Sequence, residues 1–225
     1  LFFAFSAMGA EKALVNRVGQ CILTCPGTAL YSAFDGDLKI KVGDSMRQFG
    51  DKWQMSKSID GRRFWRVPVM DGEFLVESQV GVIKKTVGGG NLLVMGADWE
   101  STMRATEAGV EAIKAVPDAI MPFPGGIVRS GSKVGSQYKG MSASTNDAYC
   151  PTLKGVTKTA LESEIGCTLE IVIDGLSDEA VRQAMRAGLK AIIDMGPETG
   201  AKRVGAGNYG GKLGPFHYHL KDLLP

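Results

Sequence analysis

The stretch NLLVMGADWE at residues 91–100 recurs, with changes, as EIVIDGLSDE at residues 170–179. The match extends without a gap from 91–135 to 170–214, at an offset of 79 residues, and eleven of the 45 aligned pairs are identical. Each copy reads as an apolar strand, a glycine, a helix and a glycine-rich loop that ends Gly-Xaa-Lys-(Val/Leu)-Gly. Two β-α-β units in tandem predict a βαββαβ fold, in which the two loops occupy equivalent positions.

The repeat also predicts how the chain is divided. Residues 87–225 form one complete ferredoxin-like lobe in this interpretation, and residues 1–86 are the remainder of an N-terminal α/β lobe. The fold class is therefore α+β, with two ferredoxin-like lobes of which the N-terminal one is incomplete. The chain has no initiator methionine, and no basic region precedes its apolar start. We therefore expect an absent N-terminal part rather than a signal peptide.

Apolar periodicity and turn residues predict the individual elements. Strands are expected at 1–7, 63–70, 72–80, 91–95, 137–145, 169–174 and 216–220. The second and third of these form a hairpin about Asp71-Gly72. A helix is expected within 10–34, interrupted or ended near Cys25-Pro26, and residues 35–61 are expected to be irregular.

Two further helices follow the repeat strands, with Asp98 and Ser177 as N-caps. Their apolar positions predict the buried faces, formed by Val110, Ile113, Val116, Val181, Met185, Leu189, Ile192 and Ile193. The three tryptophans show no spacing typical of a ligand cage, so we expect Trp53, Trp65 and Trp99 to be packing residues.

Composition excludes several classes of partner. Apolar residues make up 44% of the 225 and charged residues 22%, and the net charge is +2. These values are ordinary for a globular protein and give no electrostatic reason to expect nucleic acid or an anionic membrane. No apolar run reaches the ~18 residues that span a bilayer. We expect a cytoplasmic protein.

Cysteine and histidine spacing gives little support for a metal site. Cys21 and Cys25 are four residues apart on an expected helix, but no second pair lies nearby. We interpret them, with Cys150 and Cys167, as reduced structural cysteines. His217 and His219 would share one face of the last strand. They lack a third ligand, so a structural or surface role is favoured over metal binding.

The glycine loops are the first candidates for chemistry. Residues 205–210 fit G-x-G-x-x-G, but they follow a helix and precede a strand, which excludes the dinucleotide-binding arrangement. Residues 125–133 lack the ending of a phosphate-binding P-loop. Consecutive glycines let backbone N–H groups approach anionic or carbonyl oxygens. Lysine and serine in these loops favour ligand contact; the alternative is a pair of tight turns that bracket a strand.

Glu170 is the second candidate. It lies in LEIVI (169–173), a strand with apolar residues on both faces. A desolvated carboxylate there would have a raised pKa suited to acid–base chemistry. The alternative is an edge position in which the side chain points to water. Its equivalent in the first copy is Asn91, so the two units are not chemically identical.

Several motifs occur together in one order: GQCILTCP (19–26), PFPGGIV (122–128), SGSKVG (130–135), CPTLKG (150–155) and GNYGGKLG (207–214). In these motifs, and over essentially its whole length, the chain strongly resembles formylmethanofuran:tetrahydromethanopterin formyltransferases. Members of that family are about a quarter longer, and the missing part would be N-terminal. The resemblance implies transfer of a formyl group between the amine of methanofuran and N5 of tetrahydromethanopterin, in methanogenesis or formaldehyde oxidation.

The resemblance also implies cofactors and partners. No metal or prosthetic group is bound, because methanofuran and tetrahydromethanopterin are both substrates. Homo-oligomers, typically tetramers, are expected, with the active site near a subunit interface. A bacterial member would associate with the other subunits of a formyltransferase/hydrolase complex. The family's proposed catalytic glutamate falls on Glu170.

The motifs and the resemblance together give the candidate substrate-binding residues: Gln20, Cys21, Thr24, Pro124, Gly125, Gly126, Ser130, Ser132, Lys133, Thr152, Lys154, Asn208, Tyr209, Gly211 and Lys212. The lysines are candidates for carboxylates or phosphates of the two acidic carriers. No Ser-His-Asp or Cys-His arrangement is visible, so direct attack without a covalent enzyme intermediate is expected. The alternative function is a non-catalytic ligand-binding or scaffolding subunit of the complex.

Overall fold

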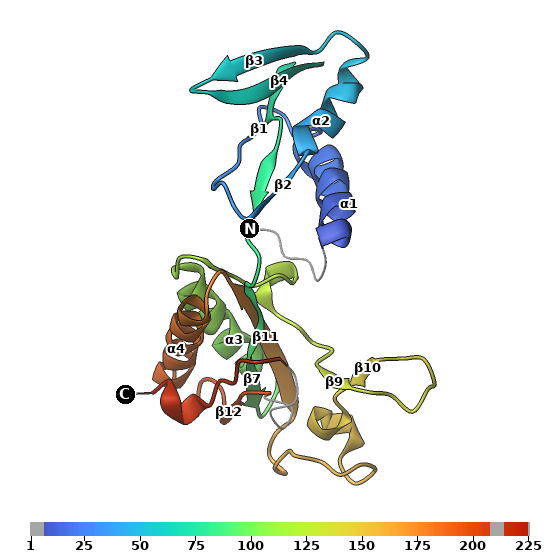
Figure 1. The fold of residues 1–225 in the computed structure, drawn as a ribbon. Helices are drawn as coiled ribbons and strands as arrows, with labels where there is room; N and C mark the ends of the chain where they lie inside the picture. Colours follow the sequence, from blue (N-terminus) through green and yellow to red (C-terminus); the bar gives the residue numbers. More distant parts are fainter. Residues whose placement is uncertain (1–6, 208–213, 225) are drawn as a thin grey trace. The chain divides into compact units, whose positions relative to one another are not determined.

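The structure is a computed structural model that describes residues 7–207 and 214–224. The chain divides into two compact units, Leu1–Lys85 and Thr86–Pro225. We call them the first and second units and describe each by itself (Figure 1). Helices and strands occur in both, so the predicted α+β class is confirmed.

The first unit combines two small sheets with two helices. Its elements are α1 (Ala7–Arg17), a π-helical turn (Val18–Ile22), β1 (Ala29–Leu30), β2 (Leu38–Ile40), α2 (Val42–Met46), a 3-10 turn (Arg47–Gly50), β3 (Met55–Ile59), β4 (Arg62–Val69), β5 (Gly72–Glu77) and β6 (Val80–Val82). One sheet has the order β1-β5-β4-β3, and β2 pairs with β6. The predicted hairpin about Asp71-Gly72 is confirmed, with Val69 opposite Gly72.

Several predictions for the first unit were wrong. The range 35–61 is not irregular, because it contains β2, α2 and β3. β3 is mostly exposed, so its sequence carries little apolar alternation. By contrast, the helix expected within 10–34 does end near Cys25-Pro26, because its last turn finishes at Ile22. Of the expected strand at 1–7, residues 1–6 lie outside the described part, and Ala7 begins α1. Trp65 is buried, but Trp53 is 80% exposed and is not a packing residue.

The second unit carries the repeat. Its elements are β7 (Val87–Gly96), α3 (Trp99–Lys114), β8 (Ala119–Ile120), β9 (Ser132–Val134), β10 (Ala143–Thr145), β11 (Cys167–Gly175), α4 (Asp178–Asp194) and β12 (Arg203–Gly205), with 3-10 turns at Pro124–Gly126, Asp147–Tyr149, Pro151–Leu153 and Leu220–Asp222. The main sheet has the order β12-β7-β11-β8, and all its neighbours are antiparallel. This is the strand order of the predicted βαββαβ unit.

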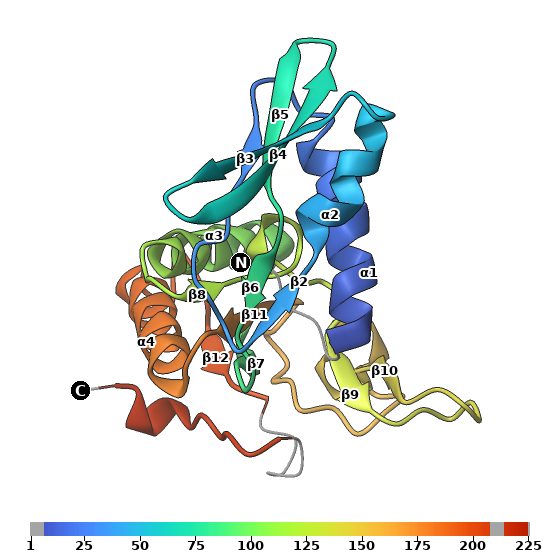
Figure 2. The ribbon, with the colours of Figure 1, turned by 45° about the horizontal axis from the view of Figure 1, so that its top comes forward.

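Helices α3 and α4 lie side by side against one face of that sheet (Figure 2). Both predicted caps are confirmed: Asp98 Oδ1 accepts from the Ser101 N–H at 2.7 Å, and Ser177 Oγ from the Ala180 N–H at 3.1 Å. The helix faces are buried as predicted, with two exceptions: Val116 lies beyond the end of α3 and is partly buried, and Ile193 is 48% exposed. It follows Ile192 directly, and a helix turns about 100° per residue, so the two cannot share one face.

The two helices meet through equivalent residues. A Cβ added at Gly109 would lie 2.9 Å from Ile192 Cδ1, and one added at Gly188 would lie 2.7 Å from Ile113 Cδ1. Gly109 and Gly188 are equivalent in the repeat, as are Ile113 and Ile192. Each isoleucine therefore fills the space above the glycine of the other helix. Such a close approach explains why glycine stands in the middle of both helices, where it is otherwise unfavourable.

The opposite face of the sheet has its own small core. Leu93 and Met95 of β7 pack there against Leu161 and Ile165. This face carries the candidate site. Two expected strands were wrong here: within 137–145 only β10 is a strand, and 216–220 is irregular up to the final 3-10 turn. None of the described helices is long and apolar enough to cross a membrane.

Candidate active site

Glu170 lies at the centre of the second unit's sheet. Its strand, β11, runs between β7 and β8. On the β8 side of β11, past the end of the short β8, Val128 pairs with Glu170. The Val128 N–H donates to Glu170 O at 2.8 Å, and the Glu170 N–H donates to Val128 O at 2.9 Å. The side chain is only 6% exposed. The alternative of an exposed edge position is therefore excluded.

The Glu170 side chain projects to the face opposite the helices. Glu170 pairs with Leu93, so the two side chains point the same way. Asn91, two residues before Leu93, projects to this face as well. Its Nδ2 donates to Glu170 Oε1 at 2.7 Å, and its Oδ1 accepts from the Gly207 N–H at 2.7 Å. A buried carboxylate and a buried amide thus form a chain of two hydrogen bonds.

Burial sets the acidity of Glu170. Desolvation raises the pKa of its carboxyl, and the hydrogen bond from Asn91 acts in the opposite direction. Asp174, four residues along the same strand, is a second buried carboxyl whose pKa burial raises, and it accepts from the Gly89 N–H at 2.9 Å. A group with a raised pKa can exchange a proton near neutral pH, which an ordinary glutamate does poorly.

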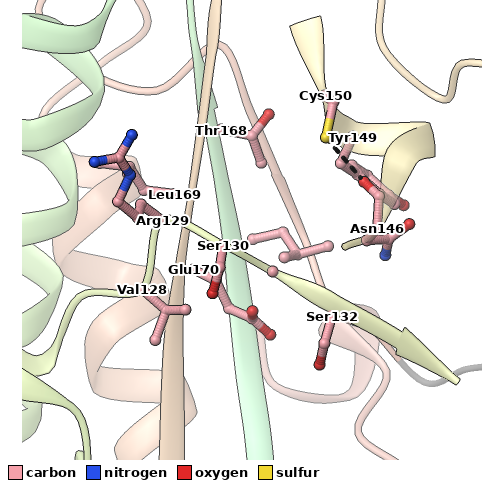
Figure 3. A pocket seen from close by; sticks show the side chains of 12 residues that line it. Val128, Arg129, Ser130, Ser132, Asn146, Tyr149, Cys150, Thr168, Leu169 and Glu170 are labelled. Atoms are coloured by element: carbon pink, nitrogen blue, oxygen red, sulfur yellow. Dashed lines mark hydrogen bonds between the residues drawn. The ribbon is translucent and has the colours of Figure 1, made fainter. Parts of the chain in front are cut away.

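A small cavity of about 40 Å³ opens beside Glu170. It is lined by segment 128–132, which contains Ser130 and Ser132, and by Asn146, Tyr149 and Cys150. Figure 3 shows the Glu170 side chain beside this segment, with Asn146, Tyr149 and Cys150 across the cavity. A Cβ added at Gly131 would lie 3.8 Å from Glu170 Oε2. Because Gly131 has no side chain, its backbone lies close to the Glu170 carboxylate.

A larger pocket of about 930 Å³ adjoins the cavity, and Arg129, Thr168 and Leu169 line both. Such a volume is in the range of small-molecule sites. Trp99, Met103, Glu107 and Glu111 of α3 form one wall, and Pro124, Gly125 and Thr152 belong to the rest. Trp99 is 62% exposed, so it was wrongly predicted as a packing residue. Three predicted binding residues thus lie together at this pocket.

The glycine turn at 124–126 has the geometry that its sequence requires. Gly125 and Gly126 have φ values of 67° and 78°, a region that favours glycine. A Cβ added at Gly126 would also lie 3.2 Å from two carbons of Val110 on α3. The turn is therefore held close to α3, while Gly125 faces the larger pocket. Gly126 itself is buried.

Two of the predicted lysines have protein partners. Lys133 forms an ion pair with Asp147, and its ammonium lowers the pKa of that carboxyl. Lys154 donates through Nζ to two backbone carbonyls, Ser163 O at 2.9 Å and Ile165 O. Lys154 thus holds the 154–165 segment in this structure, and it lines neither pocket. The substrate-binding role of both lysines stays a prediction.

The other predicted residues are divided between the units. Gln20, Cys21 and Thr24 are exposed in the first unit, at the π-helical turn and just after it, where Thr24 Oγ1 donates to Gln20 O at 2.6 Å. Single π-turns are frequent at functional sites. The predicted residues Asn208, Tyr209, Gly211 and Lys212 lie outside the described residues.

The described residues show no metal centre. Within residues 7–207 and 214–224 no three His, Cys, Asp or Glu side chains are grouped so that they could hold a metal ion. His217 and His219 are not on a strand, so the expected shared face is wrong. All four cysteines are unpaired.

Sequence reasoning missed the role of Asn91 and the contributions of Arg129, Asn146 and Tyr149. For Asn91 a signal was present, because it is the repeat equivalent of Glu170 and equivalent strand positions meet near the symmetry axis. The sequence held no such signal for Asn146 and Tyr149, because they lie in an irregular stretch without apolar periodicity.

Comparison with known families assigns the chain. A model described as "FTR, proximal lobe" matches residues 72–223, and one described as "Formylmethanofuran-tetrahydromethanopterin formyltransferase" matches residues 1–69. The chain is thus a member of a formyltransferase family. That family is the formylmethanofuran–tetrahydromethanopterin formyltransferases, as the sequence motifs indicated.

Individual relatives agree. A formylmethanofuran–tetrahydromethanopterin formyltransferase of Methylobacillus flagellatus is 53% identical over all of this chain and 75% of the relative. A relative from Methylorubrum extorquens, named as one of the subunits of a formyltransferase/hydrolase complex, is 55% identical over all of this chain and 74% of its own length. Among solved structures, the Methylorubrum extorquens formyltransferase/hydrolase complex with methylofuran matches with a TM-score of 0.91, covering 97% of this chain and 73% of the solved one at 55% identity. The Methanosarcina barkeri formyltransferase matches with a TM-score of 0.89, covering 98% of this chain and 74% of the solved one at 38% identity.

Proposed function

We propose that this protein moves a formyl group between formylmethanofuran and N5 of tetrahydromethanopterin, with Glu170 as the proton-exchanging residue. Relatives that match the whole chain carry this activity in their names. The observation that carries the catalytic assignment is Glu170 itself. It is a buried carboxyl with a raised pKa, beside a cavity and under a glycine- and serine-containing loop.

Transfer in the direction of the pterin needs one proton to move between two nitrogens. The N5 lone pair attacks the formyl carbon, a C–N bond forms, and the carbonyl oxygen becomes an oxyanion. The N5 proton passes to the Glu170 carboxylate. As the bond to the methanofuran nitrogen breaks, that nitrogen takes the proton from Glu170, and the carboxylate is restored. A carboxyl whose pKa is raised toward neutral serves both steps, because it can accept the proton from N5 and then donate it to the methanofuran nitrogen.

Segment 128–132 is the proposed site of oxyanion stabilisation. The backbone N–H groups of Arg129, Ser130 and Gly131 have no acceptor among the described residues. These three residues line the cavity beside Glu170. Backbone donors aimed at a developing negative charge contribute about 10²–10³ in rate each. No covalent enzyme intermediate is needed, since positioning of two bound carriers already lowers the barrier.

The larger pocket is the proposed binding site for part of one carrier. It shares the lining residues Arg129, Thr168 and Leu169 with the cavity beside Glu170. Trp99 offers an aromatic surface, and Arg129 is a cation for an acidic group. Figure 3 shows the Arg129 guanidinium directed away from Glu170, so it can hold a ligand without neutralising the carboxylate.

Both carriers act as substrates, and we propose that no prosthetic group is bound. Assembly with the hydrolase subunits of a formyltransferase/hydrolase complex is supported by the Methylorubrum extorquens relative, whose name places it in such a complex. Assembly as a homotetramer stays a prediction from the sequence. A cytoplasmic location, expected from the sequence, stays a prediction.

Formyl transfer between the two carriers, followed by absorbance, tests the function. Wild type should catalyse it, and Glu170→Gln should lower kcat by about 10²–10⁴ while KM for both carriers stays similar. Glu179→Gln, on the exposed side of α4, is the matched control and should act as wild type. Turnover that survives Glu170→Gln would remove the proton role. Binding of both carriers without transfer would indicate a scaffolding protein, and no binding would contradict the function.

A further inference from the structure

We propose that Asn91 is a positioning residue for the transfer reaction: it holds Oε1 of Glu170 and leaves Oε2 as the oxygen that exchanges the proton. Asn91 is 7% exposed, and its Nδ2 lies 2.7 Å from Glu170 Oε1. It touches the catalytic carboxyl rather than the reacting atoms. The inference rests on the proposed function of Glu170 and adds which of its oxygens is used, and why.

The orientation of the Asn91 amide is fixed by its second partner. The Gly207 N–H points at Asn91 from 2.7 Å and can only donate, so the amide must present its oxygen there. Its NH₂ group is then turned to Glu170. A flipped amide would set two donors against each other at Gly207 and two acceptors against each other at Glu170. The hydrogen-bond network therefore assigns the orientation of the Asn91 amide.

The two oxygens of Glu170 have different surroundings. Oε1 is occupied by Asn91, whereas Oε2 faces Gly131, where a Cβ would lie 3.8 Å away. Gly131 is part of the cavity wall. A substrate proton arriving through the cavity meets Oε2 first. A hydrogen bond to Oε1 holds the carboxylate in one rotamer, so Oε2 stays aimed at that space.

The other ionisable groups near the cavity do not replace Asn91 as the partner of the Glu170 carboxyl. The ionisable groups in the cavity wall are Arg129, Tyr149 and Cys150, and Lys133 is engaged by Asp147 just beyond it. Within the described residues, burial and the Asn91 hydrogen bond are the influences on the Glu170 pKa. The hydrogen bond from Asn91 therefore favours the charged form of Glu170, whereas burial opposes that form.

The repeat explains why the partner is an amide. Equivalent positions of β7 and β11 meet near the symmetry axis, so identical residues would place like groups together. Two glutamates there would share one proton and give coupled titrations. Asparagine has nearly the shape of a carboxylate but donates a hydrogen bond, which leaves a single titrating group.

The first experiment measures kcat and KM against pH for wild type, Asn91→Ala and Asn91→Asp. Asn91→Ala should lower kcat about ten- to a hundredfold, the range for a lost hydrogen bond to a charged group, with KM unchanged. The acidic limb of the kcat profile should move to higher pH. Asn91→Asp keeps an acceptor for Gly207 but replaces the donor to Glu170 by a second carboxyl, so it should move the limb in the same direction and further. An unmoved limb in both variants would overturn the proposal.

Thr106→Val is the matched control, because Thr106 is fully buried and its Oγ1 donates a single hydrogen bond to Thr102 O, away from Glu170. It should lower stability without moving the pH profile. In a Glu170→Gln background, Asn91→Ala should have no further effect on kcat. An equal loss in both backgrounds would show a merely structural role.

A direct titration separates this inference from the proposed function. The ¹³C signal of the Glu170 carboxyl, identified by its loss in Glu170→Gln, should titrate at higher pH in Asn91→Ala than in wild type. An unchanged titration would overturn the positioning role even if Glu170→Gln abolishes transfer. Full transfer by Glu170→Gln would instead overturn the catalytic role on which the inference rests.

Discussion

Asn91 and Glu170 occupy equivalent positions in the two repeats, and they hydrogen-bond to each other across β7 and β11. The strand register has the same symmetry. Leu92 pairs with its own equivalent, Ile171, so the local axis passes through that pair. A duplicated fold brings equivalent residues together at its axis, as a twofold dimer does. Divergence at one position then suffices to create a carboxylate with a fixed partner.

The buried carboxyl should reduce stability at neutral pH. Its pKa is raised in the folded state above the unfolded value of about 4.3, so protonation favours folding. Its contribution is complete below the unfolded pKa and is lost as pH rises through the folded one. Glu170→Gln has no carboxyl at this position, so its stability does not decrease in this way as the pH rises. We expect its free energy of unfolding to exceed that of wild type at neutral pH, by a margin that shrinks on acidification.

Urea unfolding of both proteins at several pH values measures that margin. Asp147 and Glu77 have lowered pKa values through Lys133 and Arg62, so acid destabilises both proteins alike, and the effect cancels in the difference. A margin that is constant with pH would show that Glu170 is not desolvated in the folded protein.

Gly131 should matter for rate more than for folding. Gly131→Ala would place a methyl group near Glu170 Oε2 and would strain a residue whose φ is 42°. Gly140→Ala is matched in backbone strain, with φ of 88° and nothing within 4 Å of its Cβ. Each should lose about 1–2 kcal/mol of stability.

The kinetic results of these two variants should differ. Only Gly131→Ala should lower kcat, because its methyl group narrows the space through which a proton reaches Oε2. Steady-state assays under conditions where both variants are fully folded make the comparison. Equal effects on kcat would mean that backbone strain alone, rather than crowding at Oε2, is responsible.

Much of the second unit could be predicted, because its elements are periodic and are present twice. The caps Asp98 and Ser177, the helix faces and the strand around Glu170 all followed from local chemistry. One of the predictions that failed there, the strand at 216–220, concerned a segment whose apolar residues pack onto α4 without joining a sheet. Tyr218 is buried against the helix and donates to Asp178 Oδ1 at 2.9 Å.

The rest of the site depends on contacts between distant segments, which sequence periodicity does not report. The larger pocket forms where α3 meets the turn at 124–126 and the segment at 151–152, and Trp99 is exposed there instead of packed. In the first unit, β3 was missed because its edge position leaves polar residues on both faces. Local patterns show which residues prefer to be buried, but not which surfaces meet.

Lys154 offers a prediction that separates binding from structure. Lys154→Met removes the donor of Ser163 O and Ile165 O while keeping most of the side-chain volume. We expect a loss of about 1–3 kcal/mol in stability, because two carbonyls lose a charged partner. Limited proteolysis should then cut within 155–164 more rapidly, with KM for both carriers unchanged. A raised KM at unchanged stability would instead support the predicted role in carrier binding.

The helix contact allows a test of the repeat's packing. Gly188→Ala would drive a methyl group to within 2.7 Å of Ile113 Cδ1, in a fully buried region, and should cost about 1–3 kcal/mol. Ile113→Val alone removes that methyl group and should cost about 0.5–1.5 kcal/mol. In the double variant the new methyl group occupies the vacated space, so its loss should be smaller than the sum of the single losses.

The symmetric pair, Gly109→Ala with Ile192→Val, should behave in the same way, because Ile192 Cδ1 lies 2.9 Å from a Cβ at Gly109. Thermal or urea unfolding of the two cycles gives both coupling energies. Favourable coupling in each would mean that α3 and α4 are held at one distance by two equivalent contacts. Additive losses in either cycle would show that the helices shift apart to accept the methyl group. That shift would move β7 and β11 beneath them, and with these strands the pair Asn91 and Glu170.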